Sequence, residues 1–267
     1  MNELENLDFA WCAMPIAPVK KNPEHRSELV TQLLFGDVVQ VLEKNNIWSK
    51  IKILHDEYEG YVLTMQLTKI SPSQAQHYEK HYALINVLTT STAQDQIPLT
   101  MGCRVPTALI QDIGQNIEVK LPYPKKLLLS KTEVIFDNYS TQKVVDLAKR
   151  FLYVPYLWGG KSAFGLDCSG FTQLVFRMIG IFIYRDAHQQ ATQGIPVSSL
   201  SQAKPGDLIF FRKPDAAKIS HVGIYAGNYE VIHSAGYVHI AKVDDVGLHS
   251  IYQEGYSHKL VSIRRYW

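Results

Sequence analysis

One cysteine, Cys168, stands where a glycine-rich loop is expected to turn into a helix. Gly180 provides a C-terminal stop, after apolar residues that recur at helical spacing: Phe171, Leu174, Val175, Met178 and Ile179. The thiol is therefore predicted in the first helical turn, near unpaired N–H groups and the positive end of the helix dipole. Such surroundings are expected to lower the thiol pKa and favour the thiolate. An isolated cysteine is more often a small buried apolar residue, but this position predicts a nucleophile.

A cysteine nucleophile needs a base, and two downstream histidines are candidates. His221 and His233 lie in strand-like segments joined by a turn at 226–228. With a three-residue loop, Tyr225 pairs with Tyr229, and His221 lies directly opposite His233 on one face. A two-residue loop would shift the pairing by one residue. The three-residue register predicts that the thiol and both imidazoles line up as nucleophile, base and orienting group.

Five sequence blocks resemble the NlpC/p60 family of cysteine peptidases and occur in the family's order. They are Tyr156-Leu-Trp-Gly-Gly, Gly165-Leu-Asp-Cys-Ser-Gly-Phe, Lys204-Pro-Gly-Asp-Leu-Ile-Phe-Phe, Ser220-His-Val-Gly-Ile-Tyr and Val231-Ile-His-Ser. The resemblance covers residues 140–267 and implies a papain-like core that hydrolyses peptide bonds of bacterial cell-wall peptides. It assigns Cys168 as nucleophile, His221 as base and His233 as the third polar residue.

The same resemblance implies roles for residues around the thiol. It places the Tyr156 hydroxyl beside the sulfur, where it would help the Cys168 N–H to stabilise the oxyanion. In dipeptide-releasing members the segment matching Arg185-Asp186 helps form the substrate pocket, and the aspartate binds the substrate amine. The serine that often follows there is Ala187 in this chain. The predicted substrate-binding residues that flank the nucleophile and the base are Asp167, Ser169 and Ser220.

Residues 1–70 read as short strands separated by turns, and their order resembles a bacterial SH3-like domain. This domain commonly precedes the peptidase, and in such members a glutamate and a tyrosine of the barrel close the pocket. Glu28 and Tyr58 are the matching positions and are predicted to bind substrate. The alternative is that both are polar surface residues.

The rest of the chain is expected to form a polar connector and two further domains. The connector is 71–81, and residues 82–136 are strand-rich and predict a second, divergent SH3-like barrel. Residues 140–267 are the predicted peptidase domain, with a helix from Ser140 that ends at Pro155 and a short helix between Asp186 and Gly194. The expected strands follow at 208–211, 222–225, 230–233, 238–243 and 260–264. Helices before antiparallel strands indicate an α+β fold, a papain-like catalytic domain preceded by two small barrels.

Composition narrows the function classes. The 267 residues are 46% hydrophobic and 19% charged with a net charge of +2, which argues against nucleic acid as a partner. Three scattered cysteines favour a reducing compartment. Cys168, His221 and His233 could instead be metal ligands, but no fourth ligand pattern stands out, so no metal or cofactor is predicted. The other eight histidines, including His188 and His239, are expected to be surface or structural.

The N-terminus has no basic and apolar leader pattern, and no apolar stretch is long enough to span a membrane. A cytoplasmic protein without membrane contact is therefore expected, although a chain that has lost its leader would look similar. A monomer is expected as well, although neither observation bears on the oligomeric state. The resemblance implies a γ-D-glutamyl-L-diamino acid endopeptidase that releases L-Ala-γ-D-Glu from murein peptides with a free N-terminal L-Ala, in peptidoglycan recycling. The alternatives are an exported hydrolase of the intact wall and a non-enzymatic scaffold that binds partners through SH3-like barrels.

Overall fold

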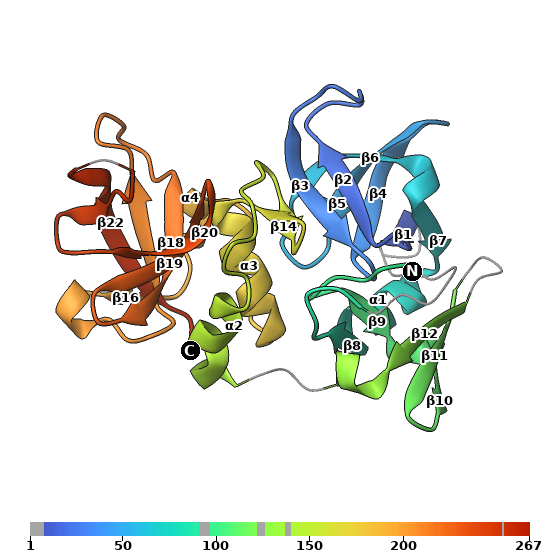
Figure 1. Ribbon diagram of the computed structural model, residues 1–267. Helices are drawn as coiled ribbons and strands as arrows, with labels where there is room; N and C mark the ends of the chain where they lie inside the picture. Colours follow the sequence, from blue (N-terminus) through green and yellow to red (C-terminus); the bar gives the residue numbers. More distant parts are fainter. Residues whose placement is uncertain (1–7, 91–96, 122–125, 137–139, 253) are drawn as a thin grey trace. The chain divides into compact units, whose positions relative to one another are not determined.

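The computed structural model describes residues 8–90, 97–121, 126–136, 140–252 and 254–267. The chain divides into two compact units, Met1–Asn138 and Tyr139–Trp267. Figure 1 shows an N-terminal unit built mainly of strands and a C-terminal unit in which helices pack beside a sheet.

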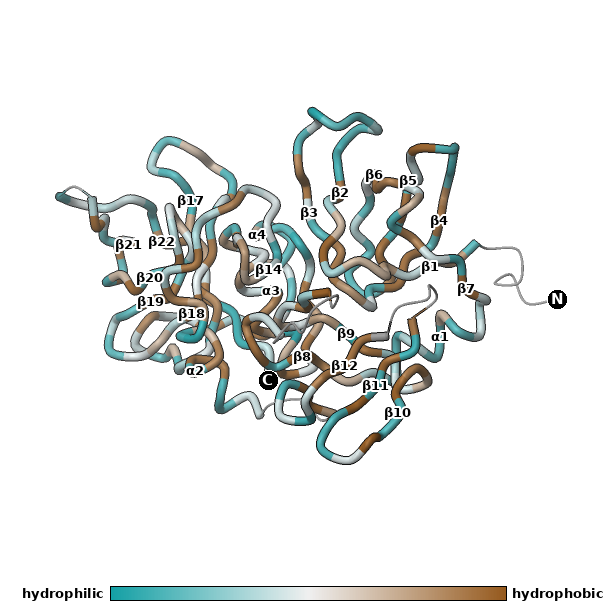
Figure 2. Tube along the Cα trace, turned by 45° about the vertical axis from the view of Figure 1, so that its right-hand side comes forward, coloured by the Kyte–Doolittle hydropathy of each residue, from teal (hydrophilic) through white to brown (hydrophobic). Residues whose placement is uncertain are grey.

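The N-terminal unit begins with a seven-stranded antiparallel sheet in the order β3-β2-β6-β5-β4-β1-β7. Alternating small and β-branched side chains from these strands form its core, including Ala17, Val19, Val39 and Ile51. The loop between β2 and β3 is hydrophilic throughout (Figure 2). The strands are β1 (Asp8–Cys12), β2 (Ile16–Lys20), β3 (Leu29–Leu34), β4 (Val38–Lys44), β5 (Trp48–Ile53), β6 (Glu59–Leu63) and β7 (Leu67–Ile70), with a 3₁₀ turn at Thr64–Gln66.

The segment predicted as a polar connector, 71–81, is polar and folds as helix α1 (Pro72–Lys80), which the sequence does not predict. Ser71 and Gln74 form a capping box, and Pro72 fits the first turn, where its missing N–H costs nothing. The helix is polar except for the buried Ala75 and Tyr78, and the Tyr78 ring packs edge-on against Trp11. Two buried positions give too weak an apolar stripe to be read from the sequence.

Two small sheets complete this unit, in the orders β13-β8-β9 and β10-β11-β12. The Arg104 N–H donates to the Phe35 carbonyl, and its guanidinium, fully buried, pairs with Glu79 at 2.9 Å. These bonds join the second half of the unit to the first. That residues 82–136 form a divergent SH3-like barrel stays a prediction. The strands are β8 (Tyr82–Ile85), β9 (Arg104–Pro106), β10 (Ile110–Ile113), β11 (Asn116–Lys120), β12 (Lys126–Ser130) and β13 (Val134–Ile135), with 3₁₀ turns at Thr107–Leu109 and Lys131–Glu133.

Helices lead in the C-terminal unit, as predicted. The first helix is shorter than expected: it does not reach Pro155, and Tyr153 already adopts a left-handed φ of 71°. Helix α3 packs against strands β18 and β19. No helix in the described parts of the chain combines the length and apolarity needed to cross a bilayer. The helices are a 3₁₀ turn (Thr141–Lys143), α2 (Val144–Lys149), α3 (Cys168–Met178), α4 (Ala187–Gln190) and a 3₁₀ turn (Leu200–Gln202).

The antiparallel sheet of this unit has the order β16-β22-β17-β18-β19-β20, with β21 also paired to β22. All five predicted strands are confirmed; four are longer than expected, and β20 has the expected length but begins one residue earlier. The strands are β16 (Ile195–Val197), β17 (Leu208–Arg212), β18 (His221–Gly227), β19 (Glu230–Ala235), β20 (Tyr237–Lys242), β21 (Gly247–His249) and β22 (Tyr256–Arg265), besides the hairpin of β14 (Lys161–Ser162) and β15 (Gly165–Leu166).

Candidate active site

Helix α3 begins at Cys168 because Asp167 caps it. The Asp167 carboxylate accepts hydrogen bonds from the N–H groups of Gly170 at 2.6 Å and Gly159 at 2.9 Å. A Cβ on Gly170 would lie 2.1 Å from the Gly160 carbonyl oxygen, so only glycine allows the loop to approach the helix this closely. The cap and the close contact together fix the loop against the first turn, where the thiol lies.

A buried ion pair supports the same turn. Both terminal nitrogens of Arg185 bond the Asp167 carboxylate, at 3.0 and 2.6 Å, and one also donates to Ser169 Oγ at 2.9 Å. Arg185 is only 1% exposed. Arg185, Asp167 and Ser169, all predicted to bind substrate, therefore hold each other in this structure and fix the position of Cys168.

The thiol lies between the start of α3 and the start of β18, with Sγ 4.0 Å from the carbonyl oxygen of Ser220. Burial raises the pKa of Cys168 to about 12, and the negative charge of Asp167 adds to the shift. The N–H groups of Val222 and Ser169 oppose the shift but do not overcome it. The expectation of a lowered thiol pKa is thus wrong, because burial and the cap carboxylate outweigh the helix dipole. The resting site holds a neutral thiol, which must lose its proton as it attacks.

The hairpin that carries both histidines differs from the predicted register. Its loop has two residues, Asn228 and Tyr229, both with positive φ as a type I′ turn requires. Ile224 pairs with Ile232, so His233 lies opposite Gly223 rather than opposite His221. The shift is two residues, and an even shift leaves a side chain on the same face of the sheet.

A β-bulge in β18 is the reason that the register differs from the predicted one by an even number of residues. Gly227 pairs with Glu230 at the turn, but Tyr225 already pairs with Val231, so Ala226 is the extra residue. Continuous pairing from the turn would set His233 opposite Ile224 and point its ring away from His221. The bulge therefore places both histidines on one face, and the prediction of a shared face is confirmed although its register is wrong.

The two imidazoles meet at 2.9 Å between His221 Nε2 and His233 Nδ1, with the ring planes at 89°. His221 is 5% exposed and His233 is 3% exposed. Since His233 occupies Nε2 of His221, Nδ1 is the nitrogen that can accept a proton from the thiol. Nε2–H can then donate to His233, an arrangement able to orient a base and to stabilise its positive charge.

Burial also makes both histidines weak bases. It lowers the pKa of His221 to about 3, with His258 and then His239 adding to the shift. Burial and the charge of His221 hold the pKa of His233 well below its usual range. Both rings are neutral at physiological pH, as a general base must be before it accepts a proton.

This burial predicts acid sensitivity. Unfolded histidines titrate near pH 6.5, so between about pH 3 and 6.5 the unfolded chain binds protons that folded His221 does not. The contribution of these histidines to the free energy of unfolding should therefore be full above about pH 6.5. It should fall as the pH drops through the window, by about 1.4 kcal/mol per pH unit for each proton. Urea unfolding at several pH values checks this. The double variant His221→Asn/His233→Asn should show a shallower fall, and a slope equal to that of the unaltered protein would contradict the assignment.

Gly223 leaves the space through which His233 reaches the base. A Cβ there would lie 2.3 Å from Val231 Cγ1 and 3.0 Å from His233 Cβ. Gly223→Ala is expected to cost about 1–3 kcal/mol of stability and to lower kcat by displacing the His233 ring. Urea unfolding and steady-state kinetics measure both effects. Adding Val231→Ala removes the closest clash and should restore part of the loss; an unaffected single variant would contradict this account.

Tyr156 lies at the same site. Its N–H donates to the Gly236 carbonyl at 2.9 Å. Burial raises the pKa of the Tyr156 hydroxyl, and the charges of Cys168 and Asp167 add to the shift, which places this hydroxyl near the sulfur. A neutral hydroxyl near the thiol can donate to an oxyanion.

The remaining predicted residues fall in both units. Asp186 follows Arg185 directly and precedes helix α4, with its N–H donating to the Gln189 side chain at 3.2 Å. Glu28 and Tyr58 belong to the N-terminal unit, where Glu28 pairs with Lys21 at 3.3 Å. Their part in substrate binding stays a prediction.

Two histidines at the site were not predicted there. His239 is 7% exposed and lies opposite His233, with the ring centroids 4.3 Å apart. The His258 ring stacks on His221. The alternation of β20, with His239 two residues from Tyr237 and Ala241, could have shown that His239 faces inward. Nothing local distinguishes His258, because its contact is made across the sheet.

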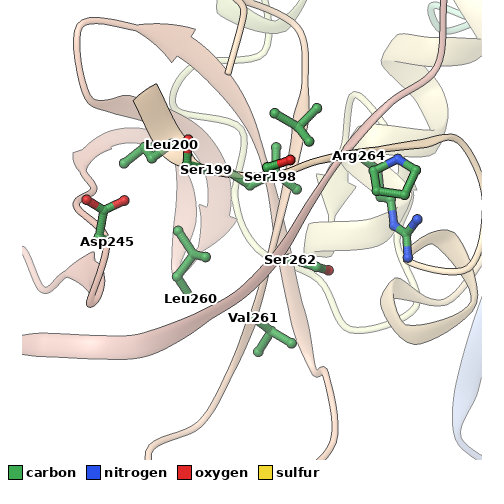
Figure 3. Close-up of a pocket in the computed structure, with 11 residues that line it drawn as sticks. Ser198, Ser199, Leu200, Asp245, Leu260, Val261, Ser262 and Arg264 are labelled. Atoms are coloured by element: carbon green, nitrogen blue, oxygen red, sulfur yellow. The ribbon is translucent and has the colours of Figure 1, made fainter. Parts of the chain in front are cut away.

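A separate hollow of about 340 Å³ lies along β16 and β22. Asp245 and Arg264 lie on opposite sides of it (Figure 3). None of the site residues predicted from the sequence lines it, so this hollow is distinct from the thiol site.

A buried thiol at a helix start, an imidazole base and an orienting second imidazole define a papain-like cysteine peptidase site. Among the described residues, no group of three or more His, Cys, Asp or Glu side chains is arranged to hold a metal ion. Residues 153–265 match the NlpC/P60 family, and residues 19–67 match the bacterial dipeptidyl-peptidase SH3 domain.

Similar proteins extend these matches over most of the chain. Two γ-D-glutamyl-L-lysine dipeptidyl-peptidases, from Bacillus cereus and Bacillus subtilis, are 30% and 31% identical to it, covering 78% and 76% of this chain and 68% and 71% of their own. An NlpC/P60 family protein from Bacillus cereus has a similar fold, with a TM-score of 0.81, 24% identity and coverage of 97% of this chain and 99% of its own. The chain belongs to the NlpC/P60 family of cysteine peptidases and carries an N-terminal SH3-like domain, which confirms both predictions.

Proposed function

We propose that the protein is a γ-D-glutamyl-L-diamino acid endopeptidase that releases L-Ala-γ-D-Glu from free murein peptides. The observation that carries this proposal is the match to two γ-D-glutamyl-L-lysine dipeptidyl-peptidases over more than two thirds of each chain. A third relative, from Lysinibacillus sphaericus, is named dipeptidyl-peptidase 6 and is 25% identical over 82% of this chain and 85% of its own. These matches cover more of this chain than the peptidase domain alone, which favours an activity that uses more than that domain.

In the proposed reaction, Cys168 Sγ attacks the γ-carbonyl carbon of D-glutamate while its proton moves to His221 Nδ1. The oxyanion would be held by the Cys168 N–H and the Tyr156 hydroxyl. His221 then gives the proton to the leaving amine of the diamino acid, and the C–N bond breaks to leave a thioester. Water hydrolyses the thioester, with His221 taking the water proton and returning it to the sulfur.

The same proposal gives Asp186 the substrate's free amine. Arg185, the neighbour of Asp186 in the chain, bonds the carboxylate of Asp167, which in turn precedes Cys168. This series of bonds fixes the backbone of Asp186 relative to the nucleophile. A carboxylate held there would bind the N-terminal ammonium two residues before the cleaved bond. Substrate binding by Glu28 and Tyr58 of the barrel is part of the same proposal.

Acetylation of the substrate tests this specificity. Acetylation removes the positive charge that would pair with the half-buried Asp186 carboxylate. The value of kcat/KM for N-acetyl-L-Ala-γ-D-Glu-L-Lys should therefore fall by roughly tenfold to a hundredfold, as loss of a charge-assisted hydrogen bond of about 1.5–3 kcal/mol does. Asp186→Asn should lower kcat/KM for the free peptide and narrow the gap between the two. Asp215→Asn, at an exposed carboxylate of the same unit, should leave both values unchanged.

Equal rates on the free and acetylated peptides would favour the alternative of a hydrolase acting on the intact wall. Peptidoglycan recycling, a cytoplasmic location and a monomeric state are parts of the proposal as well. A strong preference for the free peptide supports recycling, because stem peptides still joined to glycan have no free alanine amine.

A further inference from the structure

The ring of the catalytic base is covered by a second imidazole from a distant strand. His258 on β22 stacks on His221 of β18, with centroids 4.6 Å apart and planes at 21°. Strand β17 lies between them, and its Phe211 pairs with both His221 and Leu260. Two residues along β22 from Leu260, His258 projects from the same face of the sheet as His221.

This stack restrains the one motion that the base must avoid. A turn of the His221 ring about its Cβ–Cγ bond would move Nδ1 away from the thiol and break the 2.9 Å contact with His233. The flat contact with His258 opposes that turn. His258 is itself held, with Nδ1 3.1 Å from Ser257 Oγ. The base is thus fixed at its edge by one histidine and on its face by another.

Among the described residues, the charges that shift the pKa values of His258, His221 and His233 come from groups that are cationic or can become so. Lys213 follows β17, and His221, His233 and His239 come from β18, β19 and β20. Burial lowers the pKa of His258, and Lys213 adds to the shift. At neutral pH the ring is therefore an uncharged aromatic cover. After protonation the His258 ring would carry a positive charge in direct stacking contact with the His221 ring, which itself becomes positively charged when it accepts the thiol proton.

We propose that His258 is a positioning residue for the catalytic base: neutral, it fixes the plane of the His221 ring, and protonated, it opposes proton transfer from Cys168 to His221. This role concerns the thiol and its base, so it does not depend on which peptide is cleaved.

Two variants at this position test the proposal. His258→Phe keeps a flat ring but cannot be protonated, whereas His258→Ala removes the cover. We expect His258→Ala to lower kcat by about ten- to a hundredfold with KM changed by less than about twofold, as misplacement of a catalytic group does. His258→Phe should recover most of kcat, and the acid limb of its pH profile should move to lower pH. His249→Ala, at a histidine paired with Asp244 elsewhere in the sheet, should match the unaltered protein.

The pH dependence of Cys168 alkylation by iodoacetamide provides a second readout that needs no substrate. It separates failure of this inference from failure of the proposed peptide specificity, because it reports on the thiol and its base directly. In His258→Phe, the acid limb of the alkylation pH profile is expected to move to lower pH, as that of kcat does. Unaltered kcat in His258→Ala overturns the positioning role, and an unmoved acid limb in His258→Phe, by either readout, overturns the charge effect. If His258→Ala does not fold, a kcat of His258→Phe far below that of the unaltered protein overturns the positioning role instead.

Discussion

Cys168→Ala is expected to abolish peptide cleavage, with kcat lowered by at least about 10⁴-fold. The substitution removes the atom that attacks the carbonyl carbon, whereas Tyr156 and the buried pair of Asp167 and Arg185 remain in place. Steady-state turnover of L-Ala-γ-D-Glu-L-Lys, followed by mass analysis of the products, measures the loss. Thermal unfolding should show that the fold survives, since the exchange removes a single sulfur at the start of α3.

Cys103→Ala is the matched control, because Cys103 is fully buried in the N-terminal unit. Its removal can lower stability through a small cavity but should leave kcat unchanged. Turnover that survives in Cys168→Ala would refute the assignment of the nucleophile. An equal loss in both variants would mean that kcat reports stability rather than chemistry.

His221→Ala should lower kcat on the order of a thousandfold, because no group then accepts the proton of a thiol whose pKa is raised by burial. His233→Ala should cost less, roughly ten- to a hundredfold, since it removes only the partner that orients the base. Measuring kcat for both at one pH gives the order of the two effects, which is the test.

His77→Ala, at an exposed histidine of helix α1, controls for the loss of an imidazole as such. It should retain full activity. If His233→Ala were as damaging as His221→Ala, His233 would take part in the proton transfer itself. If neither variant lost activity, the hairpin would not belong to the site.

The parts of the site that could be predicted from the sequence are those that depend on local sequence patterns. The start of α3 follows from Asp167 and the apolar spacing behind it, and the hairpin follows from two apolar runs around a turn. The thiol pKa could not be predicted in this way, because burial and the proximity of Asp167 to the sulfur are results of packing. For the same reason the stack of His258 on His221 cannot be predicted from the sequence: 36 positions separate the two residues in the chain, and strand β17 lies between their strands in the sheet.

For the fold, too, local patterns could be predicted from the sequence, whereas features that depend on packing could not. Alternation and turn residues predict the strands of the C-terminal unit, and four of the five extend further than predicted because pairing continues past the apolar runs. Helix α1 is not predicted, because its capping box lies in a polar segment with only Ala75 and Tyr78 buried. The roles of Glu28 and Tyr58 stay a prediction from the family resemblance, because no local pattern in the sequence indicates substrate binding there.

The bulge at Ala226 also limits how the hairpin can change in evolution. Deleting this single extra residue would leave Gly227 paired with Glu230 and Tyr225 with Val231, so the pairing would become continuous and His233 would stay opposite Gly223. Both histidines would therefore keep the same face of the sheet, and only the local bend of the bulge would be lost. Deleting a second residue between His221 and Gly227 would instead move His221 by one position and turn its side chain to the opposite face. Strand β18 is thus expected to tolerate the loss of one residue next to the turn, whereas the loss of two should separate the base from its partner while the strands remain paired.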